Sequence, residues 1–356
     1  MEDKGNIPSV IRFLVTAACF VIIVAGMRTA SSILVPLLLS LFIAKICTPF
    51  LFWMQRKRIP NGLAVVVILV AIVGIGWLLV AFVGSSLNGF SRALPLYQER
   101  LAAQTAALAS WLSSHGMEVS HQVLIDYVDP RKAMGVVAST LTGLRAVLTN
   151  IFLILLTVVF ILLEASGFPQ KLRAALTDPD ESLARLSKIS ESVNRYLLIK
   201  TLFSMLTGIA IWIWLLILGV DYPLLWGLLA FLLNYVPNIG SMIAAVPALL
   251  LALIQLGTSS ALLTLLGYAV VNISIGSILE PTFMGRGLGL STLVVFLSLI
   301  FWGWVLGPVG MLLSVPLTMM VKIALESDDD TRWLAIMLGS GPPPDHAEPP
   351  AAEASQ

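Results

Sequence analysis

Apolar runs of about 20 residues recur along this 356-residue chain, and each is long enough to cross the hydrocarbon core of a membrane as an α-helix. Hydrophobic residues make up 58% of the sequence and charged residues 12%, where soluble domains carry roughly 25% charged residues. The clear runs lie at 10–27, 31–54, 61–87, 146–166, 197–219 and 260–279. The sequence therefore predicts an all-α polytopic membrane protein with about six to eight transmembrane helices.

Two further apolar regions, 222–257 and 290–325, are each too long for one straight span, and each is interrupted near its centre. The first is interrupted at Asn234–Gly240 and the second at Gly303–Gly310. Proline lacks the N–H that a helix needs and glycine tolerates a tight backbone, so each region is expected to fold as a broken helical hairpin. If both hairpins are re-entrant, about six segments cross the membrane; if every arm is a full span, about ten do.

The two interrupted regions resemble each other. Ile239–Pro247 can be laid over Val309–Pro316 with one residue skipped, and in both a proline precedes the glycine by two or three positions. Chance likeness between apolar segments is the alternative to a repeat. If the repeat is real and the hairpins are re-entrant, its topology is inverted, which in secondary transporters places the binding site near the midplane at the tips of the broken helices.

Basic residues predict the orientation, because short loops rich in Lys and Arg stay in the cytoplasm. The cluster Arg56–Arg58 and the loop 167–196 fall on the same side as the N-terminus. That side is therefore predicted to be cytoplasmic, and both counts of crossings leave the two termini there.

Residues 88–145 then form a long extracytoplasmic segment. Apolar residues of its stretch 93–114 have helical spacing, which predicts an amphipathic helix on the outer interface or against its neighbours, with a soluble mini-domain as the alternative. Residues 339–356 are rich in Pro, Ala and acidic residues and are predicted to be a disordered cytoplasmic tail. The remaining residues, 1–338, are expected to form one integral membrane transporter domain.

Few polar residues fall inside the apolar segments, where an uncompensated one costs on the order of 2–3 kcal/mol. Asn234 and Asn238 flank the first tip, Asn272 lies within a span, and Glu280 follows that span directly before a proline. The amides serve either as hydrogen-bonding contacts between helices or as part of a substrate path. Glu280 either binds a proton or cation or lies in water at the cytoplasmic face.

Three more charged residues, Lys45, Glu164 and Lys200, are interpreted as interfacial or helix-end charges. The three histidines lie outside the apolar runs and the two cysteines inside them, so neither a metal site nor a disulfide framework is predicted. The sequence has no phosphate-binding loop and no nucleophile paired with a base, and its net charge of +1 gives no attraction to nucleic acid. We therefore expect no enzyme activity, no cofactor and no nucleic-acid partner.

Three motifs together carry a family resemblance: Asn234–Gly240, Glu280–Ser291, and Gly307–Gly310 with the following Val315-Pro316. In combination they resemble the autoinducer-2 exporter family of bacterial inner-membrane permeases, and the likeness covers most of residues 10–325. The resemblance implies a multi-pass inner-membrane transporter from a family named for export of a quorum-sensing signal. Other members are assigned to sodium/proton antiport or to unknown substrates.

The chain departs from the family pattern at Lys200 and Asn272, where glutamine is expected. The candidate substrate or ion path comprises the residues of the two tips and of the span between them: Asn234, Pro237, Asn238, Gly240, Asn272, Glu280, Gly307, Pro308 and Gly310.

The leading functional hypothesis is a secondary transporter or exporter of a small solute. The alternatives are a sodium/proton antiporter of the same family and a non-transporting membrane scaffold or assembly protein. The expected partners are membrane lipids, a small-molecule or ion substrate, and further copies of the chain in a homo-oligomer.

Overall fold

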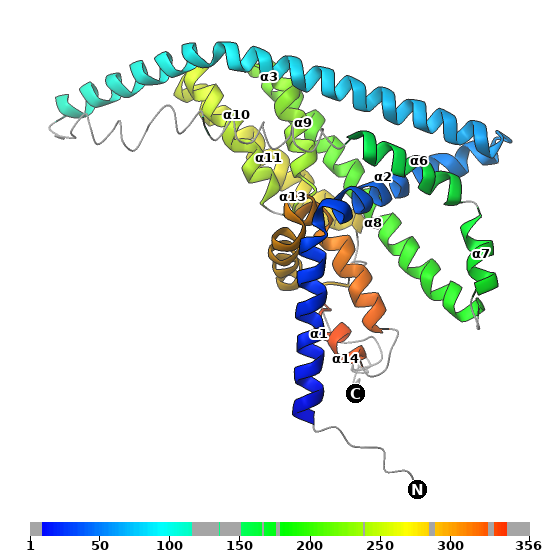
Figure 1. The fold of residues 1–356 in the computed structure, drawn as a ribbon. Helices are drawn as coiled ribbons and strands as arrows, with labels where there is room; N and C mark the ends of the chain where they lie inside the picture. Colours follow the sequence, from blue (N-terminus) through cyan, green and yellow to red (C-terminus); the bar gives the residue numbers. More distant parts are fainter. Residues whose placement is uncertain are drawn as a thin grey trace, which may run out of the picture. The chain divides into compact units, whose positions relative to one another are not determined.

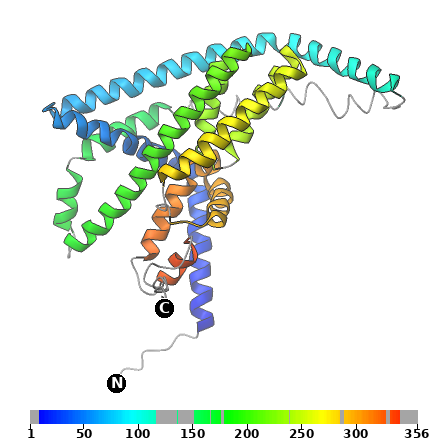
Figure 2. The ribbon, with the colours of Figure 1, turned by 180° about the vertical axis from the view of Figure 1, so that it is seen from behind.

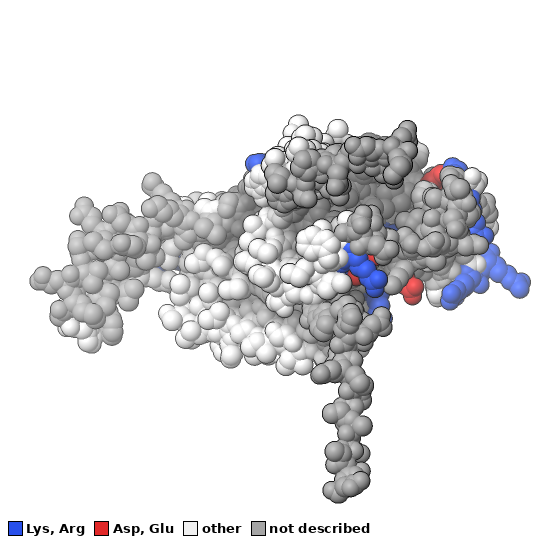
Figure 3. Space-filling model, turned by 90° about the horizontal axis from the view of Figure 1, so that it is seen from below, with Lys and Arg blue, Asp and Glu red and all other residues white. Residues whose placement is uncertain are grey.

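The regular structure is helical throughout the residues that the computed structural model describes, which are 9–115, 135, 151–165, 167–175, 179–237, 239–284, 289–326 and 331–339. The predicted all-α class is therefore confirmed. Within this part of the chain, five helices are long and apolar enough to cross a membrane: Ser31–Arg56, Asn61–Gln104, Ser190–Leu218, Thr258–Met284 and Thr292–Glu326. Shorter apolar helices accompany them, and Figure 3 shows a face on which uncharged residues cover most of the described surface.

The described helices divide into two compact units. The first unit holds the residues up to Ile43 and those from Gly289 onward. It contains α1 (Ser9–Thr29), the first part of α2 (Ser31–Arg56), α13 (Thr292–Glu326) and α14 (Arg332–Met337). Its core joins Val24 of α1 to Trp302, Leu306 and Val309 of α13.

Helix α13 is broken at Gly307, whose φ of 69° and ψ of −153° are not helical. Trp302 Nε1 donates to Thr318 Oγ1 over 3.0 Å, although a continuous helix would place these residues about 24 Å apart. The two arms therefore run side by side as a hairpin, and a Cβ added at Gly310 would overlap the Trp302 carbonyl. This confirms the predicted break within 290–325.

The second unit begins at Ala44 and contains the end of α2 together with the remaining helices. They are α3 (Asn61–Ser114), α6 (Ile151–Ala165), α7 (Phe168–Ala175), α8 (Pro179–Leu218), α9 (Pro223–Leu233), α10 (Gly240–Leu256), α11 (Thr258–Val271), the π-helical segment η1 (Asn272–Leu279) and α12 (Glu280–Met284). Helices α8 to α11 pack together in both views (Figures 1 and 2). Their shared core centres on the fully buried Trp226 and Leu225 of α9 with Leu215 of α8 and Leu251 of α10.

The predicted span 61–87 and the predicted amphipathic stretch 93–114 form one continuous helix, α3. Tyr97 and Leu101 are buried in the core of the second unit, and Gln104 Nε2 donates to the carbonyls of Leu253 and Ile254. This part of the stretch therefore packs against its neighbours, which is one of the two predicted arrangements. The side chains of Leu108, Trp111 and Leu112, and residues 116–134 and 136–150, lie outside the described residues.

The segment 167–196, predicted as a cytoplasmic loop between two spans, contains α7 and the first part of α8, and its side of the membrane stays a prediction. The sequence Pro179-Asp180-Glu181 has the proline and acidic residues that favour a helix N-terminus, and the following residues continue without a helix breaker into the apolar part of α8. Lys200 is consequently an interior residue of a long helix rather than a residue near its start.

Candidate functional site

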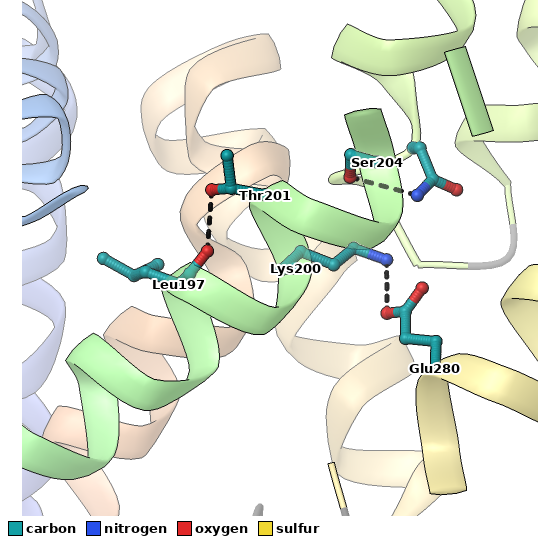
Figure 4. A network of polar contacts seen from close by, with 6 residues as sticks. Leu197, Lys200, Thr201, Ser204 and Glu280 are labelled. Atoms are coloured by element: carbon teal, nitrogen blue, oxygen red, sulfur yellow. Dashed lines mark hydrogen bonds and ion pairs between the residues drawn. The ribbon is translucent and has the colours of Figure 1, made fainter. Parts of the chain in front are cut away.

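A line of polar side chains runs along the buried face of α8. Lys200, Ser204 and Thr207 follow one another at spacings of four and three residues, which places them on one face of the helix. All three are buried, although most residues of the helix at this level are apolar. Figure 4 shows Lys200 and Ser204 in this region of the second unit. Such a line of buried polar residues requires partners on neighbouring helices.

Lys200 finds its partner in Glu280, at the start of α12. Lys200 Nζ donates to Glu280 Oε1 over 2.6 Å, as Figure 4 shows, and the two residues are only 5% and 8% exposed. The interpretation of Lys200 as an interfacial charge is therefore wrong, and so is the alternative that Glu280 lies in water. Phe203 and Phe283, with ring centroids 5.5 Å apart, hold α12 against α8 beside the ion pair.

The π-helical segment η1 places Glu280 on the buried face. The N–H of Glu280 donates to the carbonyl of Ile275, five residues earlier, where an α-helix would reach back four. Ile275 and Glu280 are both buried, whereas Ile278 and Leu279 are 58% and 39% exposed. An α-helical turn after Ile275 would place Leu279 at the buried position, so the wider turn is what brings the carboxylate to Lys200.

Two glycines bring α9 close to α8. A Cβ added at Gly227 would lie 2.7 Å from the Gly208 carbonyl oxygen, and one at Gly208 would lie 2.8 Å from the Gly227 carbonyl oxygen. Helix pairs in membranes use small residues for such backbone contact. The close crossing sets the distance at which residues near the end of α9 meet α8.

Residues just after α9 complete the cluster. Asn234 Nδ2 donates to Ser204 Oγ over 3.0 Å, and Tyr235 Oη donates to Thr201 Oγ1 over 2.8 Å. Thr201 in turn donates to the Leu197 carbonyl, as Figure 4 shows. We define the buried polar cluster as Lys200, Thr201, Ser204, Asn234, Tyr235 and Glu280.

The first hairpin tip is a tight turn at the edge of this cluster. Ile239 N donates to the Pro237 carbonyl over 2.6 Å, and Gly240 N donates to the Val236 carbonyl over 3.2 Å. A Cβ at Gly240 would overlap the Leu233 carbonyl, which repeats the contact of the corresponding glycine in the second hairpin. The predicted site residue Asn238 lies outside the described residues.

The structure brings together two of the predicted site residues, Asn234 and Glu280, through partners on α8. Asn272 begins the π-helical segment and is half-buried. Gly307, Pro308 and Gly310 belong to the first unit. That the two tips jointly form a site stays a prediction.

Sequence reasoning missed most of the α8 contribution. Because the apolar run begins at 197, the sequence predicts an interfacial or helix-end charge for Lys200, and it does not single out Thr201, Ser204 or Tyr235. The sequence signal for Ser204 is its spacing from Lys200 and Thr207 on one face of α8, whereas Thr201 and Tyr235 are identified only by the packing of the helices.

The two other charges interpreted as interfacial behave differently from Lys200. Glu164 is exposed and pairs with Lys171, also exposed, beyond the end of α6. Lys45 is half-buried and donates to Ser190 Oγ. Neither belongs to the buried polar cluster.

The chemistry of the cluster suits a polar ligand. The ion pair carries no net charge, and an ammonium group, two hydroxyl-bearing threonine and serine side chains and an amide provide donors and acceptors. Within the described part of the chain, no group of three or more His, Cys, Asp or Glu residues could hold a metal ion. The arrangement can therefore contact hydroxyl or carbonyl oxygens of a solute through several hydrogen bonds.

Sequence comparison with known proteins places the chain in a family. The sequence model described as "AI-2E family transporter" matches residues 17–327. The AI-2 transport protein TqsA of Escherichia coli (strain K12) is 47% identical, over 92% of this chain and 95% of that protein. The putative transport protein YhhT of the same strain is 39% identical over 96% of this chain and 98% of that protein. In Bacillus subtilis (strain 168), the putative transport protein YrrI is 28% identical over 83% of this chain and 86% of that protein.

The chain belongs to the AI-2E transporter family and is an integral membrane protein.

Proposed function

We propose that this chain is a secondary transporter that moves a small polar solute of the autoinducer-2 class across the bacterial inner membrane, with the buried polar cluster forming part of the solute's path. The observation that carries the proposal is the cluster itself. It contains an ion pair and several hydrogen-bonding side chains buried among apolar helices, where polar groups are costly and mark substrate or ion pathways.

The family and the relative TqsA support the solute class, because TqsA is an AI-2 transport protein. The broken hairpins support transport over a scaffold role, since interrupted helices at membrane depth require protein or cavity surroundings that a scaffold does not need. The proposal includes the orientation with both termini in the cytoplasm, a homo-oligomeric assembly and transport without catalysis.

The test is flux of autoinducer-2 through proteoliposomes that contain the full chain. Asn234→Leu keeps the side-chain size but removes the hydrogen bond to Ser204, so it should reduce flux by about tenfold or more if the amide contacts the solute. Glu164→Gln is the control, because it removes a carboxylate from an exposed ion pair outside the cluster and should leave flux unchanged.

Two results would contradict the proposal. Flux through the wild-type protein equal to that of empty liposomes would exclude autoinducer-2 as the solute. Equal flux in the Asn234→Leu and wild-type proteins would remove the cluster from the path. An internal pH change driven by a sodium gradient alone would instead favour the antiport activity.

A further inference from the structure

We propose that Lys200 is a built-in cation for Glu280, so that this chain moves an uncharged solute without binding Na⁺ or a proton at that carboxylate. The inference rests on the proposed transport function and adds to it the charge of the solute and the independence of transport from a coupling ion.

A carboxylate buried among membrane-spanning helices requires a proton or a positive partner. That partner can be a dissolved cation or a side chain of the protein. Here the ammonium of Lys200 lies 2.6 Å from Glu280 Oε1, and both residues are largely buried. The positive charge is therefore covalently attached to α8 and stays in the site when the solute leaves.

The elements packed around Glu280 contribute no second charge to the pair among the described residues. Helix α12 packs on α8 and on η1. The sequence of η1 has no charged residue, and Glu191 and Arg195 of α8 are exposed. Tyr196, one turn before Lys200, is a buried neutral phenol. Arg286 lies outside the described residues.

A dissolved cation would have to displace this ammonium to reach the carboxylate. A group that is tethered in contact competes at a high effective concentration, so Na⁺ at ordinary concentrations is at a disadvantage. The same arrangement keeps the buried site neutral, and a charged solute would leave a net charge there. The site therefore favours an uncharged solute.

The hydrogen-bonding groups specify this solute further. An ammonium has three N–H donors, and Glu280 accepts one of them in the structure. The other two N–H groups, with Ser204 one turn along α8 and Asn234 just after α9, suit the hydroxyl and carbonyl oxygens of a compact polyoxygenated molecule. The substrate class is thus a neutral, oxygen-rich small molecule.

The test compares wild type, Lys200→Gln and the double variant Lys200→Gln/Glu280→Gln as full chains in proteoliposomes. Autoinducer-2 flux is measured in sodium chloride and in choline chloride, at neutral and at mildly acid pH. Wild-type flux should change less than about twofold among these conditions. Lys200→Gln leaves the carboxylate without its cation, so its flux should fall in choline at neutral pH and recover about tenfold with Na⁺ or with acid. The double variant should lose this dependence, because it has no buried carboxylate.

A second measurement does not depend on transport. Thermal unfolding in detergent should show stabilisation of Lys200→Gln by sodium relative to choline, by about 3 °C or more, and none for the wild type or the double variant. If the wild type does not carry autoinducer-2, the proposed function fails while this measurement still decides the inference. Lys171→Gln, which removes a lysine from the exposed ion pair with Glu164, is the control and should not respond to sodium.

Sodium-dependent flux or sodium stabilisation of the wild type would overturn the inference. So would a Lys200→Gln variant with the same flux and unfolding temperature in both salts and at both pH values. If Lys200→Gln does not fold, Lys200→Arg replaces it. That variant retains the cation and should remain independent of sodium, and a sodium response in it would equally overturn the inference.

Discussion

Replacing Gly227 by alanine tests whether the close crossing of α8 and α9 builds the buried polar cluster. The added Cβ would lie 2.7 Å from both the Gly208 carbonyl oxygen and the Cβ of Trp212. Ordinary contacts begin near 3.4 Å, so the helices must separate by about 0.7 Å at this point. Overpacking of this kind destabilises by about 1–3 kcal/mol. The 3.0 Å hydrogen bond between Asn234 and Ser204 would then lengthen beyond the usual limit of about 3.5 Å.

The assay combines thermal unfolding of the purified protein with flux in proteoliposomes. Gly227→Ala should lower the unfolding temperature and also reduce flux, although residue 227 carries no polar group of the cluster. Gly74→Ala is the matched control, because a Cβ at this exposed helical position meets nothing within 4 Å. Alanine also favours the helix over glycine by about 1 kcal/mol, so this control should be as stable as wild type or more so. If Gly227→Ala unfolds at the same temperature as Gly74→Ala and transports normally, the crossing does not position the cluster.

Three further predictions concern other parts of the chain. Gly307→Ala should destabilise by about 1–3 kcal/mol in thermal unfolding, since φ of 69° with ψ of −153° is accessible almost only to glycine; an unchanged unfolding temperature would contradict the break in α13. Tyr97→Phe removes the 2.7 Å hydrogen bond to the Asp221 carboxylate and should destabilise by about 1.5 kcal/mol; a loss below about 0.5 kcal/mol would mean that this bond does not fasten α3. Ser113→Cys should react with a membrane-impermeant thiol reagent in intact inner-membrane preparations with the periplasmic face outward, while Lys57→Cys should not, and the reverse pattern would overturn the proposed orientation.

The membrane spans were predictable from the sequence because a helix in the hydrocarbon core of a membrane needs a long run of apolar residues. The runs at 10–27 and 31–54 correspond to α1 and α2 almost residue for residue. The break in α13 was also predictable, because proline lacks the N–H that a helix needs and glycine adopts backbone angles that other residues avoid. These properties belong to Pro308 and Gly307 themselves. Both features depend only on residues that are neighbours in the chain, so they can be predicted from a single sequence.

The site was less predictable, because its two charges come from helices far apart in the chain. Lys200 looked like an interfacial lysine as long as its helix was assumed to begin at 197, but α8 begins at Pro179. Glu280 follows its apolar span directly before a proline, so the sequence leaves open whether it binds a proton or cation or lies in water. Only the packing of α12 on α8 shows that each charge is the reason the other can be buried.

The π-helical segment yields a last prediction, because it behaves as an α-helix with one extra residue. Deleting the exposed Ser277 should let the segment close as an α-helix, with Glu280 now four residues after Ile275 and still on the buried face. The ion pair with Lys200 should survive, so Lys200→Gln in the deletion background should still destabilise by about 3–5 kcal/mol, as expected when one partner of a buried pair is lost. Deleting the exposed Leu266 from α11 is the control, because it removes one residue but leaves the π-helical turn in place. This deletion rotates the residues after it by about 100° about the helix axis relative to those before it. The ion pair between Lys200 and Glu280 should therefore be lost. If the Ser277 deletion makes the chain insensitive to Lys200→Gln while the Leu266 deletion does not, the extra residue is not what places Glu280, and the burial of the carboxylate must be set by the packing of α12 alone.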